Sequence, residues 1–506
     1  MFGFKKNANK KKAPAGNKNK ANGQSNTGEN QQQNKDEQDI PMKISECEDL
    51  VKKTFSNSSD VITDIFETAR EKAMIVYIDG LTNKDTTDRD IITPLKCPDF
   101  KGDVNSAIKS HLKTVKNFSQ AVLDIVNGNV AVFYENSGEI LVIDFKQWDK
   151  RSVESPEAEA VTRGPKEGFT ENIRTNTALV RRKIRNPNLI FDNVIIGRQT
   201  NTLVSLVYLK GVVNRDVLEE LKNRISKIDI DAVLESGNIE QFIDHNTLCP
   251  VSGVGVTQKP DVVAARILEG RVAILCDGTP HVLTVPELFI ENIHTAEDYY
   301  NRALYSTLIR FLRLLGLFIG IMLPGLSVAI ITYNQEMIPA PFLINLISAT
   351  QKTPLPSAAE AFFLILMFEL LKESGTRLPK TVGSAITIVG SLIIGDAAVS
   401  AGVVGAPMVI IVALTAVASF IVPNLSEFLL IYRFFFLFLG ATMGLIGIGS
   451  GMVIMMTQLI STKSFGIPIL SSFSKNEMKD SVWRSTLGSM KYRPVSIAKD
   501  NIKRMK

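Results

Sequence analysis

The residues of this sequence best suited to chemistry are polar side chains inside an otherwise apolar run, residues 381–422. Ser384, Thr387 and Ser391 are spaced i, i+3 and i+7, so on a helix they share one face. Asp396, the one ionisable group of the run, lies beyond them. Several copies of this face would line a narrow, weakly polar path, and a ring of carboxylates at its mouth favours cations. Packing of the hydroxyls against neighbouring helices explains the same spacing, and both interpretations stay open.

A second polar cluster lies between two stretches that look like folded modules. Its glycines and proline predict a fixed turn, and the basic run RRKIR at residues 181–185 needs anionic partners on a neighbouring module or protomer. Because the run lacks interleaved aromatic residues, we predict a structural joint and no nucleic-acid partner. The residues expected to form this joint or a contact between subunits are Arg163, Gly164, Pro165, Glu167, Gly168, Arg181, Arg182 and Arg185.

No set of residues in the sequence indicates a catalysed reaction. The chain has no P-loop, no GxGxxG motif after a strand and no GxSxG motif. Its four histidines and four cysteines are scattered without CxxC or HExxH spacing, which is typical of free thiols in a reducing compartment. We therefore predict that the protein is not an enzyme and has neither a metal site nor a cofactor.

The formal net charge of +5 is small for 506 residues, but lysine and arginine concentrate at the two ends. Residues 1–43 are rich in Lys, Asn and Gln and lack the apolar core of a secretory leader, so we expect a disordered basic tail. Contact of this tail with anionic lipid headgroups is the alternative to plain solvation.

The next part of the chain predicts two small mixed α/β modules. In the first we expect helices over residues 44–71 and 103–127, a buried strand over 73–80 and a hairpin over 129–145.

In the second module two strands over residues 188–213 precede a helix over 214–228 with Asn214 as N-cap. A hairpin follows over 271–286, where Asp277-Gly278 suits a type I′ turn.

The last third of the chain predicts a bundle of transmembrane helices, because one crossing takes roughly 20 apolar residues. Residues 314–333 are long enough to cross, with a kink at Pro324, and residues 381–422 hold enough for two crossings. Residues 434–462 are either one tilted helix or a tight pair, and Arg433 just before them is expected to be an interfacial anchor.

The basic loop near Arg377 and the basic C-terminal end are expected in the cytoplasm by the positive-inside rule. The N-terminal part lacks a leader and is expected there too, which requires an even number of crossings, four to six. The predicted organisation is a tail over 1–43, cytoplasmic modules over 44–150 and 188–297 with a linker over 151–187, a membrane domain over 298–462 and a basic cytoplasmic tail over 463–506.

The linker closely resembles the signature segment of the A subunits of GerA-type spore germinant receptors. The resemblance rests on the run RGPKEGF at residues 163–169, on RRKIR at 181–185, on SFGIPILSSF at 464–473 and on KYRP at 491–494, and it covers about residues 150–495. It implies a location in the spore inner membrane and assembly with a transporter-like B subunit, which is thought to bind the nutrient, and a lipoprotein C subunit. It also implies a homo-oligomer that releases monovalent cations as an ion channel.

The leading hypothesis is therefore the A component of a nutrient germinant receptor, which triggers germination as a ligand-gated cation channel. A secondary transporter that binds a small solute itself is the alternative, although the sequence shows no convincing internal repeat and the large soluble part is unusual for a transporter. A purely structural scaffold is a third interpretation and predicts no conductance.

Overall fold

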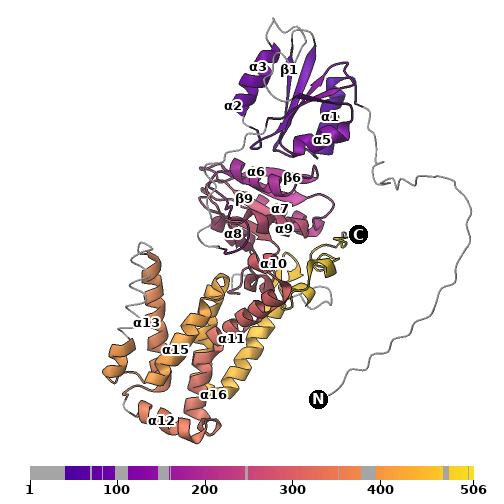
Figure 1. Cartoon of the computed structure of the whole chain (residues 1–506). Helices are drawn as coiled ribbons and strands as arrows, with labels where there is room; N and C mark the ends of the chain where they lie inside the picture. The colour runs from indigo at the N-terminus through magenta and orange to yellow at the C-terminus, as the bar shows by residue number, and fades with distance from the viewer. Residues whose placement is uncertain are drawn as a thin grey trace, which may run out of the picture. The chain divides into compact units, whose positions relative to one another are not determined.

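The computed structural model describes residues 40–505 except 69–70, 83, 97–111, 146–158, 160, 245–248, 352, 378–394, 471–477 and 500. Two mixed α/β modules are followed by a region of long helices, which confirms the fold class expected from the sequence (Figure 1).

The first module is a five-stranded antiparallel sheet of order β1-β2-β4-β5-β3. Both of its faces are covered, because side chains of β2 alternate between two apolar clusters: Met74 and Val76 face one, Ile75 and Tyr77 the other. Helices α1 and α5 cover the first face, and the short helices α2, η1 and α3 cover the second. The elements are α1 (Ile44–Thr54), β1 (Val61–Glu67), β2 (Lys72–Ile78), α2 (Lys84–Thr87), η1 (Asp88–Ile92), α3 (Thr93–Lys96), β3 (Leu112–Val115), α5 (Phe118–Val126), β4 (Val130–Tyr134) and β5 (Ile140–Ile143).

Two expected helices of this module are shorter than predicted. The helix over 44–71 ends at Thr54, since Ser56 and Asn57 have positive φ angles of 52° and 55° and the chain then pairs with β2 as β1. Of the helix over 103–127, residues 103–111 lie outside the described residues, and 112–115 form strand β3 against β5. The expected strand over 73–80 and hairpin over 129–145 are both present.

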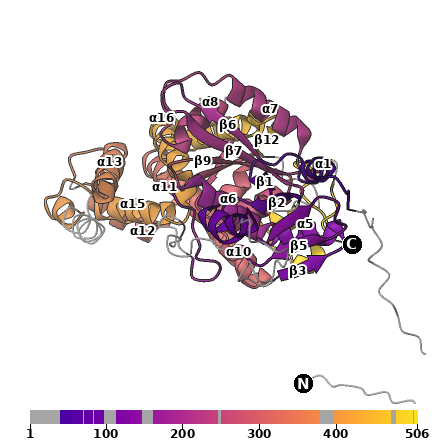
Figure 2. The same cartoon turned by 90° about the horizontal axis from the view of Figure 1, so that it is seen from above.

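The second module is another five-stranded antiparallel sheet, of order β6-β7-β9-β10-β8, and Figure 2 shows β6, β7 and β9 side by side. Helices α6 and α9 cover one face, and α7 and α8 cover the other. The elements are α6 (Ile173–Lys183), β6 (Leu189–Ile196), β7 (Thr202–Leu209), α7 (Arg215–Ser226), α8 (Ser236–Ile243), β8 (Gly255–Thr257), α9 (Pro260–Leu268), β9 (Val272–Cys276) and β10 (Val282–Val285).

The two modules repeat one topology. Numbered within each module, the strands follow the order 1-2-4-5-3 in both sheets. In each, a helix before the first strand and a helix between the third and fourth strands share one face, and the helices between the second and third strands cover the other. The soluble part is therefore a structural duplication.

The predicted helix over 214–228 is α7, capped by the Asn214 side chain, which accepts a hydrogen bond from Asp216 N at 3.2 Å. The predicted hairpin over 271–286 is β9–β10, but its turn is not type I′. Five residues connect the strands, and only Gly278 has a positive φ, of 87°. The loop is fixed from outside instead, because Asp277 Oδ1 accepts a hydrogen bond from Ile173 N at 3.1 Å.

The helical region contains two stretches that are long and apolar enough to cross a membrane, Ala303–Tyr333 and Pro423–Ser461. The first is α11, which continues through Pro324, and it packs along α16 in Figure 1. The helices are α11 (Ala303–Tyr333), α12 (Ala340–Thr350), α13 (Ser357–Arg377), α15 (Ala406–Ser419) and α16 (Ser426–Ser461).

Helix α16 is a tight helical hairpin. The backbone of Gly444 is non-helical, with φ 59° and ψ −141°. A Cβ on Gly447 would lie 2.3 Å from the carbonyl oxygen of Leu439, and the Tyr432 hydroxyl donates to Gln458 Oε1 at 2.7 Å. In a straight helix residues 432 and 458 would be about 39 Å apart. Of the two interpretations of residues 434–462, the tight pair is therefore the one observed.

The chain after α16 returns to the second module. Strands β11 (Lys463–Ser464) and β12 (Ile467–Pro468) form a two-stranded ribbon, and Phe465 and Ile467 join the apolar cluster beneath α7 and α8. Further on, Ile497 enters the same cluster, and its carbonyl accepts a hydrogen bond from Asn214 Nδ2 at 2.9 Å. We call residues 478–505 the C-terminal strap.

Candidate functional site

Arg181, in the predicted joint, ties the two modules together. Its guanidinium is fully buried and binds both carboxylate oxygens of Asp60, at 2.7–2.9 Å, just before β1. It also donates to the carbonyls of Asn186 and Leu189 and lies over the Phe191 ring, 5.0 Å from its centroid. Such a bidentate, fully hydrogen-bonded pair fixes geometry, so this residue acts as a joint inside one chain.

The neighbouring basic residues have weaker, partly exposed partners. Arg182 and Lys183 bind the Glu167 carboxylate at 3.2 Å and 3.0 Å. Partial burial raises the pKa of Glu167, but the hydrogen bonds and charges of Lys183 and Arg182 outweigh it and lower this pKa overall. Arg185 donates to Asn127 Oδ1 at 3.3 Å, at the end of α5. The basic run is thus partnered within the chain.

The turn before α6 packs against α10 (Glu297–Tyr300) and the start of α9. Gly164 has a φ of 133°, and a Cβ there would lie 2.8 Å from the Tyr300 ring, so no larger residue fits. The Pro165 carbonyl accepts a hydrogen bond from the buried Lys259 Nζ at 2.8 Å. Gly168 is buried, whereas Arg163 is exposed.

The start of α11 is locked to α10 by a buried carboxylate, and α10 is in turn tied to the second module, because the Tyr300 hydroxyl donates to Asp261 of α9. Asp298 Oδ2 accepts from Arg310 Nε at 3.1 Å and from Arg313 Nη1 at 2.8 Å. Burial acts to raise the pKa of Asp298, but both arginines lower it overall. Arg310 also binds Asp480 of the C-terminal strap at 3.1 Å. One guanidinium therefore joins α11, α10 and the C-terminal strap.

A second buried ion network lies next to this lock. Arg271 binds Glu291, and Arg266 binds Glu287 at 2.7 Å, while Arg271 and Glu287 lie 3.5 Å apart. Burial raises the pKa of Glu287 to about 7, against the opposing charges of both arginines. The Arg271 charge keeps the pKa of Glu291 low despite burial. The base of the second module thus holds one carboxyl group that titrates near neutrality.

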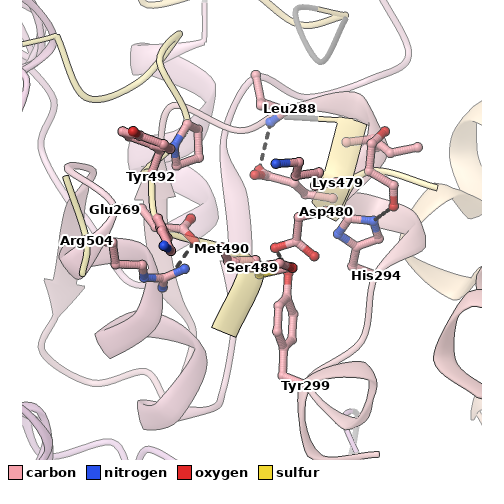
Figure 3. Close-up of a pocket in the computed structure, with 15 residues that line it drawn as sticks. Glu269, Leu288, His294, Tyr299, Lys479, Asp480, Ser489, Met490, Tyr492 and Arg504 are labelled. Atoms are coloured by element: carbon pink, nitrogen blue, oxygen red, sulfur yellow. Dashed lines mark hydrogen bonds and ion pairs between the residues drawn. The ribbon is translucent and has the colours of Figure 1, made fainter. Parts of the chain in front are cut away.

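A small open pocket of about 70 Å³ lies between the second module, α10 and the strap (Figure 3). Tyr299 donates to Asp480 Oδ2 at 3.1 Å, and His294 Nε2 contacts the Ser481 carbonyl at 2.8 Å. Burial, with the nearby Arg310 charge, lowers the pKa of His294 to about 3, so this ring is neutral. Both acidic and basic groups line the pocket, and no group of three metal-ligating side chains occurs among the described residues.

Within the helical region α11 and the first limb of α16 meet backbone to backbone. A Cβ on Gly440 would lie 2.3 Å from the Gly325 carbonyl oxygen, and a Cβ on Gly325 would lie 2.4 Å from that of Phe436. Small residues at such crossings are how helices associate in lipid.

Arg433 is not the interfacial anchor that the sequence predicted. Its side chain is buried and binds Glu369 of α13 at 2.9 Å and the Gly320 carbonyl of α11 at 2.9 Å. The reason is that a charge between apolar helices needs a counter-charge, and α13 supplies one. Arg433 thus holds three helices together.

The predicted pore-lining residues are described only in part. Ser384, Thr387 and Ser391 lie outside the described residues. Asp396 is described, and its side chain is exposed on a short helical stretch just before the break at residues 402–405.

The sequence analysis missed the roles of Asp60 and Asp298, whereas the tight pair broken at Gly444 was one of its two interpretations. Asp60 precedes β1 and Asp298 precedes α11, and nothing in their local pattern separates them from solvated acidic residues. The glycine-rich stretch 440–451 was a usable signal for the break, since glycines allow both positive φ and close helix packing.

Paired α/β modules locked to long apolar helices define a membrane-associated protein with a large soluble part. The family model described as Bacillus/Clostridium GerA spore germination protein matches residues 49–496, and the chain belongs to this family. Membership confirms the resemblance noted in the sequence and supports the role of a germinant receptor subunit in germination.

Curated relatives match along most of their length. Spore germination protein KA of Bacillus subtilis is 39% identical over 467 residues, 89% of this chain and 86% of that protein. The uncharacterized membrane protein YfkQ of Bacillus subtilis is 38% identical, over 92% of this chain and 94% of that protein. Spore germination protein GerLA of Bacillus cereus is 33% identical, over 85% of this chain and 88% of that protein.

One solved structure also matches, the N-terminal domain of the A subunit of the Bacillus megaterium spore germinant receptor GerK3. It is 32% identical with a TM-score of 0.40, and the match covers 50% of this chain and 99% of that one.

Proposed function

We propose that the protein is the A subunit of a nutrient germinant receptor in the spore inner membrane and that it oligomerises into a cation channel. The nutrient is sensed by a transporter-like B subunit, and a lipoprotein C subunit completes the receptor. Family membership supports the receptor role, and the coupling of the soluble modules to α11 supports the gating role.

The observation that carries the gating proposal is the Asp298 lock. Helix α11 has 31 residues, and at 1.5 Å per residue it is about 46 Å long, more than the hydrocarbon core needs. Its first turns are bound to Asp298 of α10 through Arg310 and Arg313, and Tyr300 of α10 donates to Asp261 of the second module. A displacement of the module by a partner subunit is therefore transmitted to the membrane helix, and a closed path is biased toward open.

We propose a multi-pass protein with both termini in the cytoplasm. The two limbs of α16 begin and end beside the second module, since Phe428 contacts Phe289 and Phe465 enters the module core. The C-terminal strap packs on the same module. This arrangement supports modules and C-terminus on one side, as the basic loop and tail also favour.

Ser384, Thr387, Ser391 and Asp396 remain our proposal for the lining of the path. Among the joint residues, Arg181, Arg182 and Arg185 have partners within the chain, so we propose the exposed Arg163 for a contact between subunits.

The test is reconstitution of the chain with its presumed partners in liposomes, followed by cation flux with and without candidate nutrients. Leucine substitutions of Ser384, Thr387 and Ser391 should change the flux, and Ser426→Leu outside this face serves as control. If all three variants show the same flux as the unmodified chain, both with and without nutrient, this face is rejected as the path.

A secondary transporter is the second candidate. The break at residues 402–405 next to the buried carboxylate of Glu360 favours it, since transporters place broken helices at their solute sites. Binding of a nutrient by the purified chain alone, measured by calorimetry, would favour the transporter over the channel.

A further inference from the structure

The first turns of α11 carry an exposed apolar face. Six large side chains lie there at spacings i, i+1, i+4, i+7, i+8 and i+11, which place them on one side of the helix. They are Leu304, Tyr305, Leu308, Phe311, Leu312 and Leu315. The opposite side holds the buried Ser306 and Arg310, so the lock to α10 leaves the apolar face open.

The C-terminal strap brings further exposed apolar side chains to the same turns of α11. Arg484 N donates to Thr307 Oγ1 at 3.1 Å, and the Ser481 carbonyl accepts from Arg310 Nη1 at 3.0 Å. The strap therefore runs along the second turn of α11. Its exposed apolar residues between and just after these two contacts are Val482, Trp483 and Leu487, and the Trp483 side chain is 66% exposed.

The length of α11 places these turns at the level of the lipid headgroups. Tyr333 lies 26 residues after Thr307 on this helix, which is about 39 Å at 1.5 Å per residue. At an ordinary tilt of about 20° this is about 37 Å along the bilayer normal. The hydrocarbon core is about 30 Å thick and the whole bilayer about 40–45 Å. With Tyr333 at the far edge of the core, Thr307 lies about 7 Å beyond the near edge, among the headgroups.

The chemistry of the exposed residues suits that layer. Trp and Tyr concentrate at the boundary between lipid and water, because their rings are amphipathic, and Trp483 and Tyr305 supply both. The exposed Arg302 and Lys479 lie next to them in the sequence and can reach lipid phosphates. The apolar face also continues through Phe318 into the part of α11 that crosses the core. This continuity favours lipid over a partner protein as the cover.

We propose that the C-terminal strap binds the membrane surface, with Trp483 and the outer face of residues 304–312 inserted into the headgroup layer. The strap also binds the second module, through the Ile497 side chain and carbonyl. It therefore holds that module at a fixed height above the bilayer. The inference rests on the proposed function only for the membrane placement of α11.

The test uses the fluorescence of Trp483 in the full-length chain. The sequence has two tryptophans, so Trp148→Phe leaves Trp483 as the reporter. The chain is reconstituted alone in vesicles of phosphatidylcholine and phosphatidylglycerol that carry a spin label at the fifth or the twelfth carbon of the acyl chain. We expect the shallow label to quench Trp483 at least about twofold more than the deep label, and aqueous acrylamide to quench it weakly.

The matched control places a tryptophan on the first module. Leu123→Trp, in a chain that also carries Trp148→Phe and Trp483→Phe, changes a half-exposed position on α5. Acrylamide should quench this control strongly, and neither lipid label should quench it. If Trp148→Phe does not fold, the difference between the unmodified chain and Trp483→Phe supplies the Trp483 signal.

Three outcomes would overturn the proposal. Trp483 could behave like the Leu123→Trp control, which places it in water. The deep label could quench it more than the shallow one, which places it in the hydrocarbon core. It could be shielded from acrylamide only after the B subunit is added, which makes a protein the cover of this face.

This result is separable from the channel proposal. A chain that passes current while Trp483 stays in water would overturn the strap proposal alone. A chain that passes no current while Trp483 is quenched by the shallow label would overturn the channel alone.

Discussion

Buried arginines connect distant parts of this chain. Arg181, Arg271, Arg310 and Arg433 are its largest fully buried side chains among the described residues. All four of these arginines bind a carboxylate on another element: Asp60, Glu291, Asp298 and Glu369. Removing one partner of such a pair leaves a bare charge in a low dielectric, which costs far more than the pair contributes.

Asp60→Asn should therefore destabilise the soluble part strongly. The substitution keeps the shape but leaves Arg181 without a counter-charge, at a cost of about 3–5 kcal/mol in the free energy of unfolding. Urea unfolding of the purified full-length chain in detergent, followed by circular dichroism, measures it. The matched control is Asp79→Asn, whose partner Arg174 is 69% exposed, and there the loss should stay below about 1 kcal/mol. Equal losses in both variants would contradict the role given to Arg181.

Glu287 should give the second module a pH-dependent stability. In the folded protein its pKa is about 7, against 4.5 in the unfolded chain. Between these values the folded state binds more protons, so the free energy of unfolding falls as the pH rises, by up to about 3 kcal/mol.

Glu287→Gln removes this proton binding, so the free energy of unfolding should change less between about pH 5 and about pH 8. Chemical unfolding across that range checks the slope. Glu219→Gln, at an exposed position on α7, should leave the slope as it is. An unchanged slope in Glu287→Gln would mean that another group titrates in this range.

At the scale of elements, the periodicity of the sequence predicted the helices and strands that depend on local sequence pattern. The β4–β5 and β9–β10 hairpins and the α7 cap follow from alternation, turn residues and an Asn N-cap. Strand β3 was mistaken for helix, because Leu112 and Val115 also fit a helical spacing and only the pairing with β5 decides. The contacts of Asp60 and of the C-terminal strap could not be predicted from local pattern, since they join residues more than a hundred positions apart in the sequence.

The helical crossing between α11 and α16 depends on two glycines. Gly440→Ala would place its Cβ 2.3 Å from the Gly325 carbonyl oxygen, so the helices must separate, at a cost of about 1–3 kcal/mol. A lower melting temperature in detergent is the expected readout. Gly449→Ala is the control, because a Cβ there meets no atom within 4 Å. Equal melting temperatures for both variants would contradict the crossing.

The hairpin in α16 should be visible by crosslinking. With Cys47, Cys97, Cys249 and Cys276 replaced, cysteines at Tyr432 and Gln458 should join through a short bifunctional reagent, since these side chains touch. A partner cysteine at Ile446 in place of Gln458 gives the control, because that side chain is 82% exposed and lies beside the Gly444 break, at the turn of the hairpin. A 432/458 pair that fails to join in folded protein would indicate a straight helix.

At the scale of the molecule, two copies of one α/β architecture are coupled in series to a helical bundle. Arg181 joins the first module to the second, and Asp298 joins α10, which follows the second module, to α11. Each connection is a buried ion pair with two or more hydrogen bonds. A displacement of one part is therefore transmitted to the next part through a rigid contact.

Asp298→Asn should uncouple nutrient sensing from ion release. Arg310 keeps Asp480 as a partner, so the chain should still fold and reach the membrane, but nutrient-triggered release of cations from spores should fall at least severalfold. Release measured by flame photometry, with protein abundance by immunoblot, checks this. Asp229→Asn, at an exposed partner of Arg198, should behave as the unmodified chain. Normal release in Asp298→Asn would show that the signal takes another route.

The return of the chain after Ser461 sets the order in which the protein is completed. Phe465, Ile467 and Ile497 belong to the core of a module whose strands are translated some two hundred residues earlier. While the ribosome is still making the helical bundle, these three side chains are missing, so the module exposes an apolar surface to chaperones and proteases. A nascent chain that stops anywhere in the bundle never covers this surface, so the folding of the second module depends on completion of the helical region that precedes the strap.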